Sequence, residues 1–200
     1  MSTPSLADVT ASPVDVGVPV EEPEVAAAPV ASPGVPRHPV VLVLLIGLPV
    51  LAFAAFGFGA QAVVTAVAAA VLVALAAIDI EHRVLPNRIL VPATIVLLVA
   101  QIAFFPDRAL EWLLAGFAAA AFLALPLIVR RDAMGMGDIK LALLLGVVVG
   151  WDVFGAIVLG CLAMLPFAVV MLVRKGSIRG ATLPFGPFLA FGAVVLLFTS

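Results

Sequence analysis

The chain has 200 residues, of which 64% are hydrophobic and 11% charged, and its mean hydropathy is +1.31. Soluble domains carry about 45–50% apolar and about 25% charged residues, so this composition excludes a soluble globular protein. The formal net charge of −2 gives no basic excess for binding nucleic acid. A single cysteine, Cys161, excludes a disulfide framework or a thiolate metal site built within the chain.

The first 38 residues predict a disordered tail. Proline recurs throughout this segment and prevents any continuous helix. A secretory leader needs basic residues before an apolar core, and this segment is acidic and broken by proline. We therefore expect a cytoplasmic tail over residues 1–38 and one transmembrane domain over residues 39–200.

Apolar stretches follow one another from Val40 onward, each near the length of about 20 residues that crosses a hydrocarbon core. The fifth stretch is short, so it is either a half-length helix or merges irregularly with the sixth. The sequence thus predicts an all-α polytopic membrane bundle of six to seven helices. The seven candidate spans are Val40–Phe58, Ala62–Ile80, Ile89–Phe105, Leu110–Val129, Ile139–Gly150, Val153–Val173 and Leu183–Phe198.

The basic residues predict how these spans are oriented. If the N-terminal tail is cytoplasmic, nine of the ten Lys and Arg residues fall on the cytoplasmic side, and Arg108 falls on the other. Short cytoplasmic loops collect Lys and Arg in this way. We expect the N-terminus inside and the C-terminus outside.

Two acidic residues stand at the predicted cytoplasmic boundary. Asp79 ends the second span and Asp138 begins the fifth, and an Asp inside a membrane helix costs about 2.5–3.5 kcal/mol. The two can meet only if the second and fifth helices pack together. Carboxylates brought close share one proton, so that one activates water while the other protonates a departing amine. The helix dipoles favour Asp138 as the base and Asp79 as the acid, titrating as a pair.

Simpler interpretations of these residues remain open. Taken singly, Asp79 is a solvated charge at a helix end and Asp138 is an N-cap of the fifth helix. A metal site would use Asp79 with His82, but zinc sites are usually formed by several His or Cys ligands. Because His38 and His82 are the only histidines, we expect no metal and no cofactor.

Residues around Asp138 are candidates for supporting roles. Gly135 and Gly137 allow unusual backbone angles and the close approach of an extended peptide, or form a plain flexible loop. The positive charge of Lys140, two residues further on, adds to the effect of the helix dipole and favours the ionised form of Asp138.

Prolines mark two further supporting segments. Pro86 and Asn87 form a turn between the second and third spans, or a plain connector. Pro184, Gly186 and Pro187 loosen the start of the last span, where irregular backbone borders protein or a wet cavity. Proline is also tolerated in any first helical turn.

Three blocks in this order resemble the type IV prepilin peptidase family: residues 79–92, the run Gly-Met-Gly-Asp-Ile-Lys at 135–140, and Pro-Phe-Gly-Pro-Phe at 184–188. The resemblance covers about residues 60–200. It implies a GxGD-type aspartic protease fold with Asp79 and Asp138 as the catalytic pair. The implied substrate is a prepilin or pseudopilin, cut between its short basic leader and its hydrophobic segment at the cytoplasmic face of the bacterial inner membrane.

The chain also departs from the family's larger members, which carry a cytoplasmic zinc domain with paired cysteines and N-methylate the trimmed pilin. Here a proline-rich tail stands in that place, so the chain resembles the short, peptidase-only form. The presenilin-like class also uses GxGD, but it pairs that motif with an aspartate after tyrosine. Ile78 precedes Asp79 and the chain has no tyrosine.

A different class of function stays open, namely a small membrane transporter or assembly scaffold that uses the two aspartates for proton relay or helix packing. Such a protein would carry its charges near the middle of the bilayer and show two related halves, and the sequence shows no convincing repeat. The particular substrate and the oligomeric state remain open.

Overall fold

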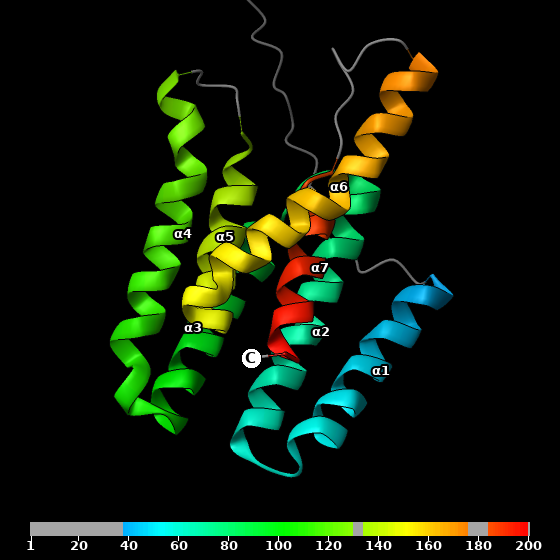
Figure 1. Cartoon of the computed structure of the whole chain (residues 1–200). Coiled ribbons are helices and arrows are strands. Elements are labelled where there is room, and N and C mark those ends of the chain that lie inside the picture. Colours follow the sequence, from blue (N-terminus) through cyan, green and yellow to red (C-terminus); the bar gives the residue numbers. More distant parts are fainter. Residues whose placement is uncertain (1–37, 130–133, 176–183, 200) are drawn as a thin grey trace, which may run out of the picture. The chain divides into compact units, whose positions relative to one another are not determined.

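The computed structural model describes residues 38–129, 134–175 and 184–199, and every regular element within these ranges is helical, as the sequence predicts. The predicted tail lies outside these ranges except for its last residue, His38. Two short 3-10 turns, η1 (Pro106–Arg108) and η2 (Gly150–Asp152), join the α-helices. The α-helices are α1 (Pro39–Phe56), α2 (Ala60–His82), α3 (Asn87–Phe104), α4 (Ala109–Val129), α5 (Met136–Val149), α6 (Val153–Lys175) and α7 (Gly186–Leu197) (Figure 1).

Five helical segments in the described ranges are long and apolar enough to cross a membrane. They are α1, α2, α3, η1 with α4, and the run Met136–Arg174, in which η2 joins α5 to α6. Alone, α5 has 14 residues, which agrees with the expected short fifth segment joined to the sixth. The last helix is shorter than expected, because α7 begins at Gly186 and has only 12 residues.

The connection between α2 and α3 follows from three residues. Arg83 adopts a left-handed backbone conformation with φ 53°, and its N–H donates to the Asp79 carbonyl at 2.9 Å, which ends α2. Pro86 then serves as the N-cap of α3, and a proline is compatible with a helix start because those N–H groups have no helical partner. The predicted turn is therefore present.

The helices pack as neighbouring pairs, α1 with α2, α4 with α5, and α6 with α7. In addition, α7 (red in Figure 1) packs against both α2 and α5, and α3 does the same. Contact between α2 and α5 themselves is at most slight. The direct packing of α2 and α5, expected from the sequence as a condition for the two acids to meet, is thus not needed, because α3 and α7 bridge the two helices.

Small residues set the closest helix crossings. A methyl group on Gly146 of α5 would lie 2.6 Å from the Ala115 carbonyl oxygen of α4, and one on Gly192 of α7 would overlap the Ala156 carbonyl of α6. Glycine at a crossing lets two backbones touch, which is how helices associate within lipid.

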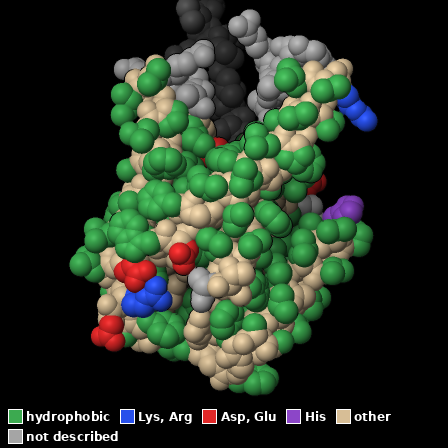
Figure 2. Space-filling model, in the orientation of Figure 1, with side chains coloured by type: hydrophobic (Ala, Val, Ile, Leu, Met, Phe, Trp, Pro, Cys, Tyr) green, Lys and Arg blue, Asp and Glu red, His purple; other side chains and the backbone are tan. Residues whose placement is uncertain are grey.

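Large apolar side chains cover the outside of the bundle. Val43, Phe117 and Val173 are more than 60% exposed, and Figure 2 shows hydrophobic side chains over most of one face. Charged side chains gather on this face near the α3–α4 connection, which carries Asp107 and Arg108. Such a surface suits acyl chains, and the protein is a polytopic membrane bundle.

Candidate active site

Asp79 lies in the last turn of α2 and is buried, with only 6% of its surface exposed. The next residues, Ile80, Glu81 and His82, are exposed. The interpretation of Asp79 as a solvated charge at a helix end is therefore wrong. The start of α7 covers the carboxyl group that the helix end would otherwise present to solvent.

Gly186, the first residue of α7, is the part of α7 closest to this carboxyl group. A methyl group at this position would lie 2.6 Å from Asp79 Oδ2 and 3.2 Å from Asp79 Cγ. Only a residue without a side chain fits there. The Gly186 N–H is placed to donate to this carboxyl group, but Asp79 Oδ2 has no hydrogen-bond partner of good geometry among the described residues, which is rare in native proteins and often marks a functional group.

Asp138 is the third residue of α5 and is half-buried. Gly135 is the N-cap of α5, so the interpretation of Asp138 as the N-cap is wrong. The Asp138 N–H donates to the Gly135 carbonyl at 3.1 Å. The Asp138 side chain lies close enough to Asp79 to feel its charge. Two acids far apart in sequence thus lie near each other at one end of the bundle, and neither forms an ion pair with a described residue.

Lys140 is held by the third helix. Its Nζ donates to Asn87 Oδ1 at 2.8 Å, and this bond ties the start of α5 to the start of α3. In the described structure, Lys140 bonds to Asn87 and forms no ion pair with Asp138. Pro86 and Asn87 contribute to the site through this tie between helix ends.

The two glycines of the 135–140 motif have different surroundings. A methyl on Gly137 would lie 3.1 Å from Leu85 Cβ, so the α2–α3 turn of the chain itself occupies that space. Gly135 is exposed, and among the described residues a methyl there would meet Asp138 Oδ2 alone, at 3.4 Å. Of the two, Gly135 alone leaves room for an extended peptide.

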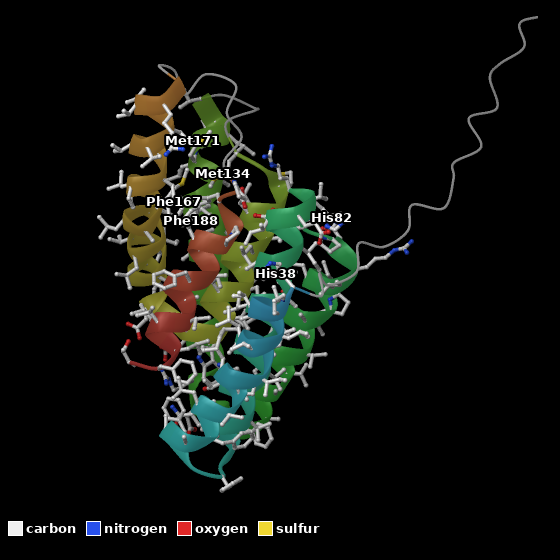
Figure 3. The ribbon with its side chains drawn as sticks, turned by 90° about the vertical axis from the view of Figure 1, so that its right-hand side faces the viewer. His38, His82, Met134, Phe167, Met171 and Phe188 are labelled. Atoms are coloured by element: carbon white, nitrogen blue, oxygen red, sulfur yellow. The ribbon has the colours of Figure 1, made fainter. Side chains whose placement is uncertain are left out.

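Pro184 and Pro187 flank Gly186 and are half-buried. Both line a groove, but the groove is apolar rather than wet. Sequence reasoning missed its aromatic walls, Phe167 and Phe188, which lie side by side in Figure 3 with ring centroids 5.3 Å apart. A phenylalanine in an apolar run carries no sequence signal that separates a groove wall from a lipid-facing residue.

Metal binding gains no support from the described residues, where no group of three His, Cys, Asp or Glu side chains comes together. His82 is exposed at the end of α2, and His38 precedes α1 (Figure 3).

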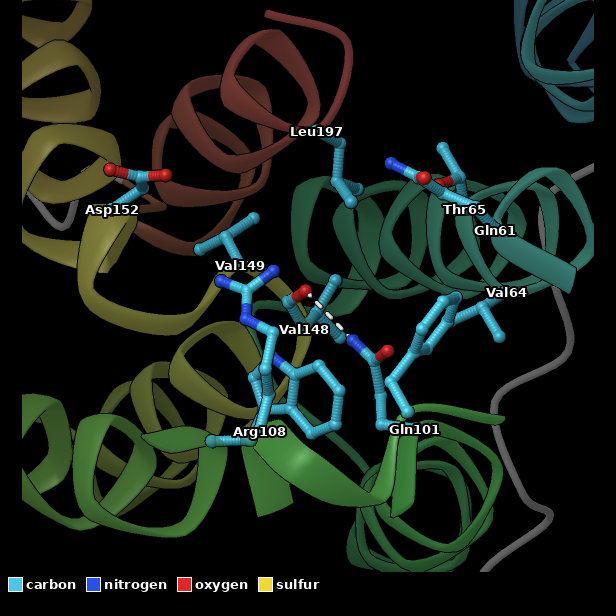
Figure 4. A pocket seen from close by; sticks show the side chains of 11 residues that line it. Gln61, Val64, Thr65, Gln101, Arg108, Val148, Val149, Asp152 and Leu197 are labelled. Atoms are coloured by element: carbon cyan, nitrogen blue, oxygen red, sulfur yellow. Dashed lines mark hydrogen bonds between the residues drawn. The ribbon is translucent and has the colours of Figure 1, made fainter. Parts of the chain in front are cut away.

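A second cavity, of about 340 Å³, lies at the other end of the bundle and contains neither Asp79 nor Asp138 (Figure 4). Its polar lining includes Gln101, which donates through Nε2 to the Val148 carbonyl at 3.1 Å. Nearby, Arg108 forms a two-pronged ion pair with Glu111, with nitrogen-to-oxygen distances of 2.8 and 2.9 Å. At this end, therefore, Gln101 bonds to the backbone of α5 and Arg108 to Glu111.

We compared the sequence with models of known protein families, with curated proteins and with solved structures. The model of the type IV leader peptidase family matches residues 66–172, a range that includes both Asp79 and Asp138. No solved structure matches the chain significantly.

Several curated relatives carry the name prepilin leader peptidase/N-methyltransferase. The protein from Pseudomonas aeruginosa is 31% identical over 148 residues, which is 71% of this chain and 51% of the relative. The protein from Stutzerimonas stutzeri is 30% identical with the same coverage. The Legionella pneumophila protein is 30% identical over 174 residues, 81% of this chain and 58% of its own length. The chain spans about half the length of these relatives, and it belongs to the type IV leader peptidase family.

Proposed function

We propose that the chain is a membrane aspartic endopeptidase that removes the short basic leader of type IV prepilins or pseudopilins at the cytoplasmic face of the bacterial inner membrane. In this proposal Asp79 and Asp138 are the catalytic pair. Membership of the leader peptidase family supports it, as do the printed names of the relatives. The observation that carries it is that a buried acid with an unsatisfied oxygen, Asp79, lies near a second acid from a separate helix, Asp138, at one end of the bundle.

The chemistry needs only the two carboxyl groups and water. One carboxylate takes a proton from a water molecule while the water oxygen attacks the carbonyl carbon of the scissile peptide bond. The other carboxyl group gives its proton to the leaving amine as the carbon–nitrogen bond breaks. Two neighbouring carboxyl groups that share one proton supply both functions, so the proposal requires neither a metal nor a cofactor.

The surroundings of Asp79 favour this chemistry over a structural role. A buried acceptor without a partner costs about 1–3 kcal/mol, and Asp79 Oδ2 is such an atom among the described residues. A structural acid would satisfy both oxygens with N–H groups or a cation. An oxygen kept unpaired can bind an attacking water or share the proton of Asp138.

Orientation follows from charge. With the tail inside, nine of the ten basic residues fall on the cytoplasmic side, which is the side of the α2 C-terminus. Asp79 and Asp138 then face the compartment in which prepilins are made. We therefore propose a multi-pass inner membrane protein whose N-terminus and active site are cytoplasmic.

Other residues of the site act by positioning. Gly186 leaves room for the Asp79 carboxyl group, and Gly135 leaves room for a peptide beside Asp138. The bond from Lys140 to Asn87 fixes the start of α5, and with it Asp138, relative to α3.

The transporter or scaffold alternative fits the geometry less well. A proton relay across the membrane requires ionisable groups along the path. Here both acids lie at one end of their helices, Asp79 in the last turn of α2 and Asp138 in the first turn of α5.

The proposal is tested by co-expressing the chain with a prepilin and measuring leader removal. Asp79→Asn and Asp138→Asn each keep the size of the side chain and remove its acid–base function. We expect each to lower processing by about 10²- to 10⁴-fold. As a matched control, Asp152→Asn changes an exposed acid at the other end of the bundle and should process normally. Normal processing by either Asp79→Asn or Asp138→Asn, at equal membrane levels, would remove that residue from the mechanism.

A further inference from the structure

An apolar groove with a volume of about 560 Å³ lies beside Asp79. Every described residue that lines it is apolar, and five of the seven are phenylalanine or proline. The lining residues are Ile80, Ala163, Phe167, Pro184, Pro187, Phe188 and Phe191.

The groove exists because α6 and α7 touch at one end and diverge at the other. Gly160 of α6 lies against the backbone of α7, where a methyl group would be 2.8 Å from the Phe188 carbonyl oxygen. Beyond this crossing α6 tilts away from α7 (Figure 1). Ala163 and Phe167, one and two turns further along α6, then form one wall, and Phe188 and Phe191 of α7 form the other.

This groove lies next to the candidate catalytic site, although neither Asp79 nor Asp138 is among the described residues that line it. Ile80 directly follows Asp79, and Pro187 directly follows Gly186, the residue in contact with the Asp79 carboxyl group. A chain lying in the groove therefore has one end next to Asp79.

The groove also opens to the side of the bundle. Ile80 is 62% exposed, Phe167 is 58% exposed and Phe191 is 56% exposed. Phe167 lies on α6, and the exposed side chains around it on that helix, among them Leu165 and Val170, are apolar as well. An apolar segment can therefore enter from within the bilayer without first passing through water.

We propose that this groove binds the apolar segment of the substrate that directly follows the scissile bond. The inference rests on the proposed peptidase function and adds to it the surface that selects the substrate. Such a substrate has an apolar segment after its leader, and the groove offers an uncharged aromatic surface of the size of an ordinary ligand pocket. A basic leader has no partner in this lining. It must extend from Asp79 to the other side, toward the exposed Gly135.

Two substitutions test the groove, each with a matched control elsewhere on the surface. Ala163→Phe fills the groove, and Ala121→Phe makes the same change on an exposed position of α4. Phe167→Ala removes one wall, and Phe117→Ala removes a similarly exposed aromatic ring, 64% exposed, from α4. None of these four residues belongs to the candidate catalytic pair or contacts it in the described structure.

The enzymes are assayed in vesicles on two substrates. One is a model prepilin with a short basic leader and an apolar helix of about 20 residues, and the other is the same peptide truncated soon after the scissile bond. We expect Ala163→Phe to raise KM for the long substrate about tenfold, and Phe167→Ala several-fold, because each removes apolar contact with the bound segment. The kcat for the long substrate and all constants for the truncated peptide should stay near the wild-type values, and both controls should match wild type.

A photo-crosslinking residue at position 163 identifies the occupant. We expect it to label the model prepilin within the first turns after the scissile bond. Labelling of lipid alone would assign the groove to an acyl chain and overturn the inference.

The groove proposal and the peptidase proposal fail in different ways. If wild type cleaves both substrates and the groove variants keep wild-type KM values, the groove inference is wrong while the peptidase function stands. If wild type cleaves neither substrate, or Asp79→Asn cleaves as well as wild type, the peptidase proposal itself is wrong.

Discussion

The two ends of the bundle differ in whether their acidic side chains form ion pairs. At the end that carries Asp79 and Asp138, two acids approach each other and form no ion pair with a described residue. At the other end, Glu111 binds Arg108 through two contacts below 3 Å, and the Arg108 guanidinium also lies 5.6 Å from the Trp112 ring centroid. The first end holds a buried acid with an unsatisfied oxygen, whereas the acids of the other end are either paired, as Glu111 is, or exposed to solvent, as Asp107 and Asp152 are.

This difference separates stability from chemistry. Paired groups lower the free energy of the folded state and have little capacity left for a substrate. An unpaired buried acid raises that free energy and is kept only where it has another use. Substitutions at the two ends should therefore change different measured quantities.

After substitution of the two aspartates themselves, the largest effect is expected from Gly186→Ala. Its methyl group would lie 2.6 Å from Asp79 Oδ2, so the carboxyl group or the start of α7 must move. Displacing a catalytic group by about 1 Å costs on the order of 10²-fold in rate. We expect kcat for prepilin cleavage to fall by about this factor, with membrane insertion retained.

Gly47→Ala is the control for that substitution, because a methyl group on Gly47 of α1 meets nothing within 4 Å. It should leave kcat unchanged. Equal, wild-type activity in both variants would show that contact between α7 and Asp79 does not position the acid.

A smaller effect, and on stability instead of activity, is expected from Gln101→Leu. The buried Gln101 amide donates to the Val148 carbonyl near the end of α5, and interhelical bonds of this kind contribute about 0.6–2 kcal/mol in membrane proteins. We expect the free energy of unfolding in mixed micelles to fall by about 1 kcal/mol, with kcat unchanged. Gln61→Leu changes an exposed glutamine of the same cavity and should alter neither. A loss of activity in Gln101→Leu without a loss of stability would contradict the division between the two ends.

The smallest effect is expected from Glu111→Gln. The Arg108 and Glu111 side chains are 60% and 28% exposed, and exposed ion pairs contribute little because water screens them. The free energy of unfolding should fall by no more than about 0.5 kcal/mol and prepilin cleavage should be unaffected. A reduction in cleavage by Glu111→Gln would mean that the far end takes part in catalysis.

The positions of the helices were predictable because a helix that crosses lipid must be a long apolar run, and charged residues usually mark its ends. The predicted Val153–Val173 span compares with α6 at Val153–Lys175, and Leu110–Val129 compares with α4 at Ala109–Val129. The start of α7 was misjudged, since Leu183 is as apolar as the helix it precedes. Which helices are neighbours was not predictable, because apolar runs facing lipid and apolar runs facing other helices have the same composition.

The candidate site was predictable in its charged residues only. An acid at a membrane boundary stands out in an apolar sequence, and so Asp79 and Asp138 were found. The burial of Asp79 was not predicted, because it depends on contact with Gly186, which lies more than a hundred positions later in the sequence. The bond from Lys140 to Asn87 and the groove beside Phe167 also depend on tertiary packing, which no spacing in the sequence encodes.

The crossing of α6 and α7 limits how the molecule can move. Gly160 and Gly192 bring the two backbones together without side chains between them, so no rotamer change can widen or narrow this junction. The two helices therefore move as one rigid body, and the wedge that opens beyond the junction keeps its angle. An apolar segment that binds in the groove must therefore enter and leave laterally, in the plane of the bilayer. The rates of entry and release then depend on lateral diffusion and on how tightly the segment contacts the lining residues.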